Sequence, residues 1–499
     1  MSLSALAAGA VVAARNPWPR YLVNEGEWRD ASAALADGAL TLIGLWGEVD
    51  CVHLAVLDAA QSDLAVLTLE CVEGSFPSIG ALHAPAIRFE RAVEDLFGLE
   101  PKGAIDRRAW LDHGRWSAGA PLARTPHAAR APSYDFLPAE GESLHQVAVG
   151  PVHAGIIEPG HFRFTANGDT VVRLEERLGY AHKGVESLMA GADLERGLKL
   201  AGRVSGDSTV AYAFAFARAA EAALGIEAPP RAQRLRAVMA ELERLANHFG
   251  DIGAICNDAA FVMMHAHCSV LRERVLRSAD ACFGHRLMRD FILPGGVARD
   301  IDASGVSHLR KGLRDWRRRF RGLITLYDET PSLEDRTVGT GIVKPELARQ
   351  FGAGGFVGRA SGRAFDARTA FPYPPYDRFT PEVPVLQEGD VDARVWIRIR
   401  EAEHGMTLIE RMLDDLPDGA LRVETPACAG EGMALVEGFR GDVLVWLKLD
   451  AEAKIARCHL RDPSWMQWPL LEAAIEGNIV GDFPLCNKSF NCSYSGHDL

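Results

Sequence analysis

The sequence lacks any apolar run long enough to cross a membrane. A spanning helix needs about 20 predominantly apolar residues, and no stretch of the 499 residues approaches that composition. We therefore expect that the chain does not cross a membrane by itself. The apolar segment 1–14 has neither the basic start nor the cleavage site of a secretory signal. We interpret it as a loose N-terminal segment of a cytoplasmic protein.

Signatures of disulfide scaffolds and of dinucleotide enzymes are also missing. The nine cysteines are an odd number scattered over a long chain, which indicates reduced thiols in a cytosolic compartment rather than a disulfide framework. No GxGxxG segment follows a predicted strand, which argues against NAD binding by this chain.

Basic residues are fewer than acidic residues. The net charge is -13, from 67 acidic and 54 basic residues, which argues against a nucleic-acid surface. One short segment is the exception, and its basic residues are Arg310, Lys311, Arg314, Arg317, Arg318, Arg319 and Arg321. We interpret this segment as a solvated helix face or a subunit contact, in preference to a nucleic-acid or lipid-headgroup site.

The elements that are present predict at least two domains, since the chain is too long for one ordinary core. Helices are expected at 28–35 and 86–97, the second of them amphipathic. Apolar runs typical of strands lie at 40–46, 52–57 and 64–72. We therefore predict a small ferredoxin-like α/β domain over residues 15–120.

A linker is predicted at 121–145, which contains four prolines and few large apolar residues. The rest of the chain, 146–499, is predicted to be mainly helical, so the fold class is α+β. From Arg231 onward, apolar residues recur every three or four positions, which is typical of a helix with one buried face. Further helices are expected at 304–326 and 408–416. The stretch 354–376 is rich in Gly, Pro and aromatic residues and is expected to be an ordered loop, not helix.

Short motifs along the chain resemble two subunits of respiratory complex I. Phe89-Glu90-Arg91 and Asp95-Leu96-Phe97-Gly98 resemble the signature of its small peripheral subunit. Later motifs resemble the large subunit of complex I and of formate-hydrogenlyase-type nickel-iron hydrogenases; they lie at 150–153, 158–159, 179–186, 229–233, 358–362 and 389–398. Their order is that of a fusion of the two subunits, so the chain is identified as a member of this superfamily.

The cysteines that hold the metal in hydrogenase large subunits are missing. Those subunits bind nickel and iron through the patterns RxCGxCxxxH and DPCxxC, because soft metal centres need thiolates. The first pattern here has Ser205 and Ser208 for cysteine and Tyr212 for histidine, and the second has Ser493 and Gly496 for cysteine. A hydroxyl is neutral at pH 7, and glycine has no side chain. We therefore expect no metal ligands, no nickel-iron centre and no hydrogen turnover.

Two other cysteines lie near the chain end. Cys486 and Cys492 are six residues apart, and they have no CxxC partner nearby. We interpret them as buried free thiols rather than as a displaced metal site.

In the family, the cavity between the two patterns holds the metal or, in complex I, receives the quinone headgroup. His153 matches the first of two loop histidines of complex I, but the second falls at Ile157 and the quinone-binding tyrosine at Gly206. Quinone stays a candidate acceptor on this resemblance, without its usual contacts. His153 is expected either to bind a substrate or to cap a turn.

Glu158 resembles the acidic residue that starts the proton path in membrane-bound hydrogenases. A carboxylate near a polar cavity can relay protons; the alternative is a surface-loop glutamate. Ser205, Asp207, Ser208 and Tyr212, with Ser493 and Gly496, are expected to form a polar cluster at the former metal site, which holds a small polar ligand or, more simply, water.

The resemblance implies a subunit of a membrane-associated respiratory oxidoreductase, located in the cytoplasm and peripheral to the inner face of the cytoplasmic membrane. Its expected partners are an iron-sulfur small subunit, which carries the iron-sulfur cluster, and antiporter-like membrane subunits, with electron transfer coupled to ion translocation. The chain itself is expected to bind no cofactor. The alternative is a non-catalytic scaffold or conformational transducer. A polar pocket open at the former metal site favours the first hypothesis, and a filled core favours the second.

Overall fold

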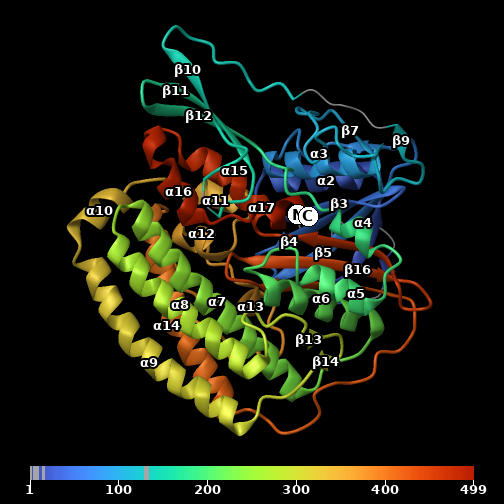
Figure 1. The fold of residues 1–499 in the computed structure, drawn as a ribbon. Helices are drawn as coiled ribbons and strands as arrows, with labels where there is room; N and C mark the ends of the chain where they lie inside the picture. Colours follow the sequence, from blue (N-terminus) through green and yellow to red (C-terminus); the bar gives the residue numbers. More distant parts are fainter. Residues whose placement is uncertain (1–2, 4–10, 14–16, 129–133, 155) are drawn as a thin grey trace.

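A computed structural model describes residues 3, 11–13, 17–128, 134–154 and 156–499 (Figure 1). The predicted N-terminal segment 1–14 therefore lies mostly outside the described residues. The N-terminal domain occupies one end of the molecule, drawn in blue, and a group of long helices occupies the other.

The N-terminal domain is built on a five-stranded sheet. In spatial order its strands are β1 (Val11–Ala13), β2 (Arg20–Val23), β5 (Asp63–Glu70), β4 (Cys51–Asp58) and β3 (Thr41–Gly47). Strand β2 is parallel to β5, and the other neighbours are antiparallel. Its helices are α2 (Glu25–Ala36), which Asn24 caps with a capping box, and α3 (Ile87–Phe97). The predicted α+β class is thus confirmed, although the β3–β4–β5 meander departs from the βαββαβ order of a ferredoxin-like domain.

Both faces of this sheet are buried, which explains why its strands are almost continuously apolar. Leu42 and Leu54 share one core with Trp28 of α2 and Phe89 of α3. Residues of the opposite face share a core with a second sheet from the C-terminal part of the chain. That second sheet, which the sequence pattern did not predict, consists of β15 (Gly430–Glu437), β16 (Asp442–Leu449) and β17 (Ile455–Arg461).

The predicted linker contains little regular structure among its described residues. Its elements are the short strand β9 (His127–Ala128), which pairs with β8 (Ala118–Gly119), and the start of β10 (Leu144–Val149). Strand β10 forms an antiparallel sheet with β11 (His161–Asn167) and β12 (Thr170–Arg177), which projects from the body of the molecule in Figure 1.

The long helices are α6 (Thr209–Leu224), α7 (Pro230–Asp258), α8 (Val262–Phe283), α9 (Ala303–Asp328) and α14 (Val391–Asp414). Helix α6 packs against β15 and β16, and the other four pack side by side at the other end of the molecule (Figure 1). The helices predicted from Arg231 and at 304–326 are confirmed as α7 and α9. The helix predicted at 408–416 is only the end of α14, which begins at Val391 after the cap Asp390. Its apolar pattern is interrupted by buried Arg394, Arg398 and Glu401. For this reason the sequence did not predict the first half of the helix.

The stretch 354–376 was predicted to contain no helix, and this is wrong in part. It contains two short helices, α12 (Gly355–Ala360) and α13 (Ala367–Ala370). The smaller elements elsewhere are β6 (Ser75–Pro77), β7 (Glu100–Lys102), β13 (Ile292–Leu293), β14 (Gly296–Val297), η1 (Ala84–Ala86), η2 (Val480–Asp482), α4 (Val185–Met189), α5 (Leu194–Ala201), α10 (Pro331–Thr337), α11 (Pro345–Gln350), α15 (Ser464–Ala474), α16 (Phe483–Phe490) and α17 (Tyr494–Asp498).

Three further features bear on the expectations from the sequence. Among the described helices, none is long and apolar enough to cross a bilayer. All nine cysteines are free thiols, and Cys486 and Cys492 are buried. The basic segment lies on α9, where Arg310 and Arg317 pair with Asp414 and Glu410 of α14.

Candidate functional site

The two halves of the former metal pattern meet in space. Ser205 lies between α5 and α6, and Ser493 lies just before α17, yet their Oγ atoms are 2.9 Å apart. Ser493 is held in place by its own bonds, because its N–H donates to Ser464 Oγ at 2.9 Å and its Oγ accepts from Gly496 N at 2.9 Å. Both serines are buried. The hydroxyls that replace two of the thiolates therefore bond to each other.

Asp207 and Arg440 form the charged part of this cluster. Asp207 Oδ1 accepts from Ser205 Oγ at 2.6 Å, and the guanidinium of Arg440 binds both carboxylate oxygens, at 2.9 and 2.5 Å. Arg440 Nη1 also donates to Ser208 Oγ at 3.2 Å. Burial alone would raise the pKa of Asp207, but the charge of Arg440 holds that pKa below its usual value. Asp207 is therefore an anion paired by a fork-shaped cation.

The place of the fourth cysteine is taken by another carboxylate. Asp462 Oδ2 would lie only 2.4 Å from a Cβ atom on Gly496, which is too close for a side chain there, and it accepts from Tyr212 Oη at 2.8 Å. Burial, followed by the charge of Asp462, raises the pKa of Tyr212 well above its usual value, so the phenol stays protonated. These residues offer hydroxyl and carboxylate oxygens but no thiolate. The donor set does not fit a nickel-iron centre.

A polar cavity of about 330 Å³ opens beside the cluster. Its lining residues are Ile156, Ile157, Glu158, Ser205, Gly206, Asp207, Arg440, Asn487, Lys488, Asn491, Cys492, Ser493, Tyr494 and Ser495. Of the site residues predicted from the sequence, Glu158, Ser205, Asp207 and Ser493 therefore line one cavity. Ser208, Tyr212 and Gly496 are buried next to the same cluster.

The two residues predicted to be catalytic occupy different places. Glu158 is exposed at the cavity, and its Oε2 accepts from Ser495 N at 3.0 Å. His153 is not among the cavity-lining residues; its Nε2 is 2.8 Å from the carbonyl oxygen of Gly160. The structure thus brings Glu158 to the cluster and ties His153 to its own loop.

Sequence reasoning missed three charged residues of this site. Arg440 lies in the turn between β15 and β16, and Asp462 directly follows β17, so neither belongs to a motif. The third, Glu243 of α7, accepts from the backbone N–H groups of Val210 and Ala211 at 2.6 and 3.0 Å. Burial raises the pKa of Glu243 to about 8. The one available signal was the charged Arg440-Gly441-Asp442 turn between two apolar runs.

Comparison with known proteins shows which family the chain resembles. Residues 258–430 and 423–498 match the family described as respiratory-chain NADH dehydrogenase, 49 Kd subunit. Formate hydrogenlyase subunit 5 of Escherichia coli (strain K12) is 33% identical over 439 residues, which cover 85% of this chain and 77% of that protein. A subunit of the NADH-quinone oxidoreductase of Syntrophobacter fumaroxidans is 31% identical over 354 residues, covering 70% of this chain and 94% of that protein.

The chain belongs to this family of large subunits. It is thus a subunit of an oxidoreductase complex. A solved structure described as the membrane-bound sulfane sulfur reductase, an archaeal respiratory membrane complex, has a chain that matches with a TM-score of 0.68 and 26% identity, over 72% of this chain and 99% of that one. The length of this large subunit fits a fusion, as the motifs indicated.

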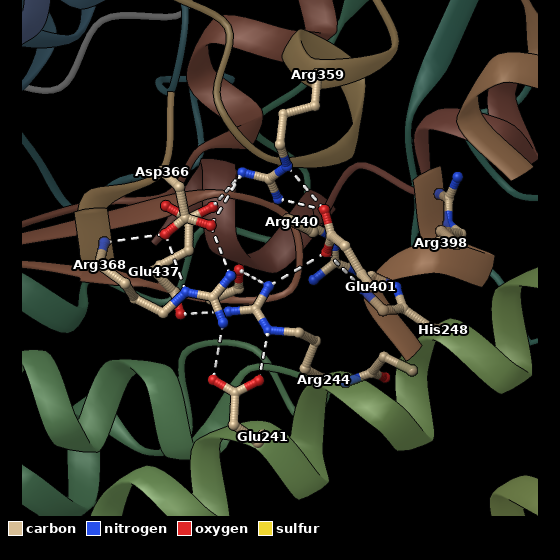
Figure 2. Close-up of polar contacts among 12 residues, drawn as sticks. Glu241, Arg244, His248, Arg359, Asp366, Arg368, Arg398, Glu401, Glu437 and Arg440 are labelled. Atoms are coloured by element: carbon tan, nitrogen blue, oxygen red, sulfur yellow. Dashed lines mark hydrogen bonds and ion pairs between the residues drawn. The ribbon is translucent and has the colours of Figure 1, made fainter. Parts of the chain in front are cut away.

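In this large subunit, a second polar cluster is fully buried (Figure 2). Glu401 of α14 is at its centre and binds Arg359 at 2.7 Å and His248 of α7 at 2.8 Å. Burial would raise the pKa of Glu401, but Arg359 and His248 hold it well below its usual value. We call the set the closed network; it consists of Glu241, Arg244, His248, Arg359, Asp366, Arg368, Glu401 and Glu437, all buried.

Most polar groups of the closed network are paired within the protein, although His248 Nδ1 has no hydrogen-bond partner and four members line a cavity of about 170 Å³. Glu241 binds Arg368 at 2.8 Å and Arg244 at 3.2 Å, as expected for an ion pair at i,i+3 on one helix. Arg359 also binds Glu437, at 3.0 Å. Arg440 is also drawn in Figure 2; it follows Glu437 of the closed network by three residues in the chain and lines the cavity.

Proposed function

We propose that this chain is the large subunit of a membrane-associated respiratory oxidoreductase that delivers electrons to an acceptor bound in the 330 Å³ cavity and works without a nickel-iron centre. The observation that carries the proposal is the bond of 2.9 Å between Ser205 and Ser493 at the rim of an open polar cavity. This contact joins two positions at which the family has metal-binding cysteines, and it lies beside a cavity that could still hold an acceptor.

The proposed assembly follows the relatives. An iron-sulfur small subunit would supply electrons from its cluster, and antiporter-like membrane subunits would couple the transfer to ion translocation. The chain would then lie in the cytoplasm, peripheral to the inner face of the cytoplasmic membrane. The relatives include a subunit of an NADH-quinone oxidoreductase and a chain of a sulfane sulfur reductase, which supports two classes of acceptor, a quinone and a sulfane sulfur compound.

The chain's own groups suit reduction of either acceptor. Two electrons would come from the partner's cluster, and two protons would enter through the solvent-exposed Glu158, which lies at the cavity. Arg440 and Lys488 line the same cavity. Their positive charges would stabilise the negative charge that develops on the acceptor as electrons arrive.

The second hypothesis, a scaffold or conformational transducer, also has an observation in its favour. The space of the metal ligands is filled, because Ser205 and Ser493 bond to each other and Asp462 Oδ2 would lie only 2.4 Å from a Cβ atom on Gly496. In that hypothesis the cavity holds only water, and the subunit transmits motion between its partners.

Metal analysis of the purified complex is the first test, with hydrogen uptake assayed on the same sample. We expect no stoichiometric nickel and no hydrogen turnover; nickel in a 1:1 ratio would overturn the proposal. Quinone and polysulfide are then offered as acceptors to wild type, Lys488→Met and Glu158→Gln.

The variants separate the two hypotheses. We expect Lys488→Met to raise the KM for the acceptor and Glu158→Gln to lower kcat, each about 10-fold or more. A matched control is Arg318→Gln on α9, whose side chain is 75% exposed. If the complex reduces an acceptor and both cavity variants match this control, the cavity is not the acceptor site and the transducer hypothesis is favoured.

A further inference from the structure

Three metal-ligating side chains meet at one end of the β3–β4 hairpin, away from the cavity. Glu48 follows β3, and Cys51 and His53 lie on β4. Cys51 Sγ is 3.6 Å from His53 Nε2, His53 Nε2 is 3.2 Å from Glu48 Oε2, and Cys51 Sγ is 3.8 Å from the same carboxylate oxygen. All three ligand atoms therefore face one point.

We propose that Glu48, Cys51 and His53 form a zinc site that fastens the N-terminal domain. Tetrahedral zinc, with bonds of about 2.3 Å to sulfur and about 2.0 Å to nitrogen and oxygen, separates its ligand atoms by about 3.3–3.6 Å. The three separations in the protein, 3.6, 3.2 and 3.8 Å, lie close to these values. Cysteine, histidine and glutamate are all ordinary zinc ligands, and water would complete the tetrahedron.

Surrounding groups orient the ligands. His53 Nδ1 is 2.9 Å from Thr68 Oγ1, and Nε2, which contacts Glu48 Oε2 at 3.2 Å, is the nitrogen that would bind the metal in place of that contact. A threonine hydroxyl donates or accepts, so it suits either tautomer of the imidazole. The second carboxylate oxygen of Glu48 accepts from Lys448 Nζ at 2.8 Å. Metal-binding histidines and carboxylates are commonly held by such outer contacts.

Aromatic packing fixes the imidazole further. The ring of His53 is fully buried and packs against Trp46 and Trp446, with ring centroids 5.3 and 5.1 Å away. Trp446 and Lys448 both belong to β16. A metal at this point would therefore fasten the β3–β4 hairpin where it faces the C-terminal sheet.

The protonation states suit zinc for two of the three ligands. Burial lowers the pKa of His53, so its imidazole is neutral at pH 7. Burial would raise the pKa of Glu48, but hydrogen bonds with His53 and Lys448 bring it to about 2. Burial, followed by the charge of Glu48, raises the pKa of Cys51 to about 12. Zinc would have to displace the thiol proton of Cys51.

The test uses the full-length chain without an affinity tag, stripped of metal and titrated with Zn²⁺, then with Co²⁺ as a coloured probe. We expect one zinc per chain and, with cobalt, a thiolate-to-metal absorption band. The matched control is Cys71→Ser, because Cys71 is a buried thiol just after the neighbouring strand β5. Cys51→Ser should lose the band and weaken binding at least 10-fold, while Cys71→Ser should keep both.

A second variant tests the site at a ligand whose replacement should not disturb folding. Glu48 is only partly buried, with a side-chain exposure of 21%, so Glu48→Gln should fold as wild type does. We expect its affinity for zinc to be at least 10-fold lower than that of wild type. A wild-type chain that binds no zinc, or a Cys51→Ser chain that binds it as well as Cys71→Ser, would overturn the proposal. Neither result depends on the acceptor chemistry of the cavity.

Discussion

The two buried polar clusters of this protein use the same residue types in different ways. In the closed network, Arg359 and Glu401 turn every charge toward another member or toward backbone. In the cluster at the former metal site, Asp207 and Arg440 also pair with each other, and both line a cavity of about 330 Å³. Four members of the closed network border a smaller cavity, of about 170 Å³, but every member is at most 4% exposed, whereas the side chain of Asp207 is 33% exposed. The more exposed cluster can therefore exchange a bond with a ligand more readily.

Breaking the closed network should have the largest effect. Arg359→Leu leaves Glu401, Glu437 and Asp366 without a cation that lies within 3.4 Å of each. Removing one partner of a buried ion pair costs about 3–5 kcal/mol, so we expect a loss of this size in the free energy of unfolding, measured with denaturant. Arg318→Gln is the control, with a change within about 0.5 kcal/mol. A loss below about 1 kcal/mol for Arg359→Leu would show that the network is not sealed.

The dependence of stability on pH should reveal Glu243, which is buried against the start of α6. Its pKa is about 8 in the folded chain against 4.5 for the free side chain. The fold therefore binds a proton that the unfolded chain releases, and stability should fall as pH rises from about 5 to 8. Because glutamine mimics the protonated carboxyl, Glu243→Gln should remove a few kcal/mol of this dependence.

That prediction is checked by unfolding wild type and variant at several pH values. Other buried carboxyls, such as Glu90 with a pKa raised to about 7 by burial, contribute the same slope to both proteins. The difference between the two curves therefore isolates Glu243. Parallel curves would mean that Glu243 is ionised in the folded chain across this range.

The contrast between the clusters also explains what the sequence could predict. Helix α7 was predicted because Leu235, Leu242 and Leu245 form an apolar stripe among its buried residues. The first half of α14 was not predicted, because the charged residues Arg394, Arg398 and Glu401 occupy buried positions there. Ser205, Asp207 and Ser493 were found through the metal pattern that they replace.

The partners that complete the site could not be found in that way. Arg440 and Asp462 meet Asp207 and Tyr212 across more than two hundred residues of chain. Only the packing of the β15–β17 sheet against α6 brings them together. The charged turn at Arg440 marks a polar position between two apolar runs, but no local pattern around Arg440 or Asp462 identifies the residue that it contacts.

Disrupting the cluster at the former metal site should lower the free energy of unfolding by less than breaking the closed network does. Asp207→Asn removes the charge that pairs with Arg440, but Asp207 is 33% exposed and water from the cavity can take its place. We expect a loss of about 1–2 kcal/mol in the free energy of unfolding, together with an increase in the KM for the acceptor. A loss as large as that of Arg359→Leu would show that the two clusters are energetically alike and would remove the distinction drawn between them.

The smallest predicted effect is the difference in stability between alanine variants of two serines in the cluster at the former metal site. Ser205 Oγ donates to Asp207 at 2.6 Å and lies 2.9 Å from Ser493 Oγ, so Ser205→Ala should cost about 1 kcal/mol. Ser208 Oγ makes a longer contact, 3.2 Å from Arg440 Nη1, and Arg440 keeps both bonds to Asp207 without it. Ser208→Ala should therefore change stability by no more than about 0.5 kcal/mol. Equal losses for the two variants would mean that the pair Asp207–Arg440 depends on Ser208 as much as on Ser205. The cluster would then resemble the closed network, in which each contact contributes to stability.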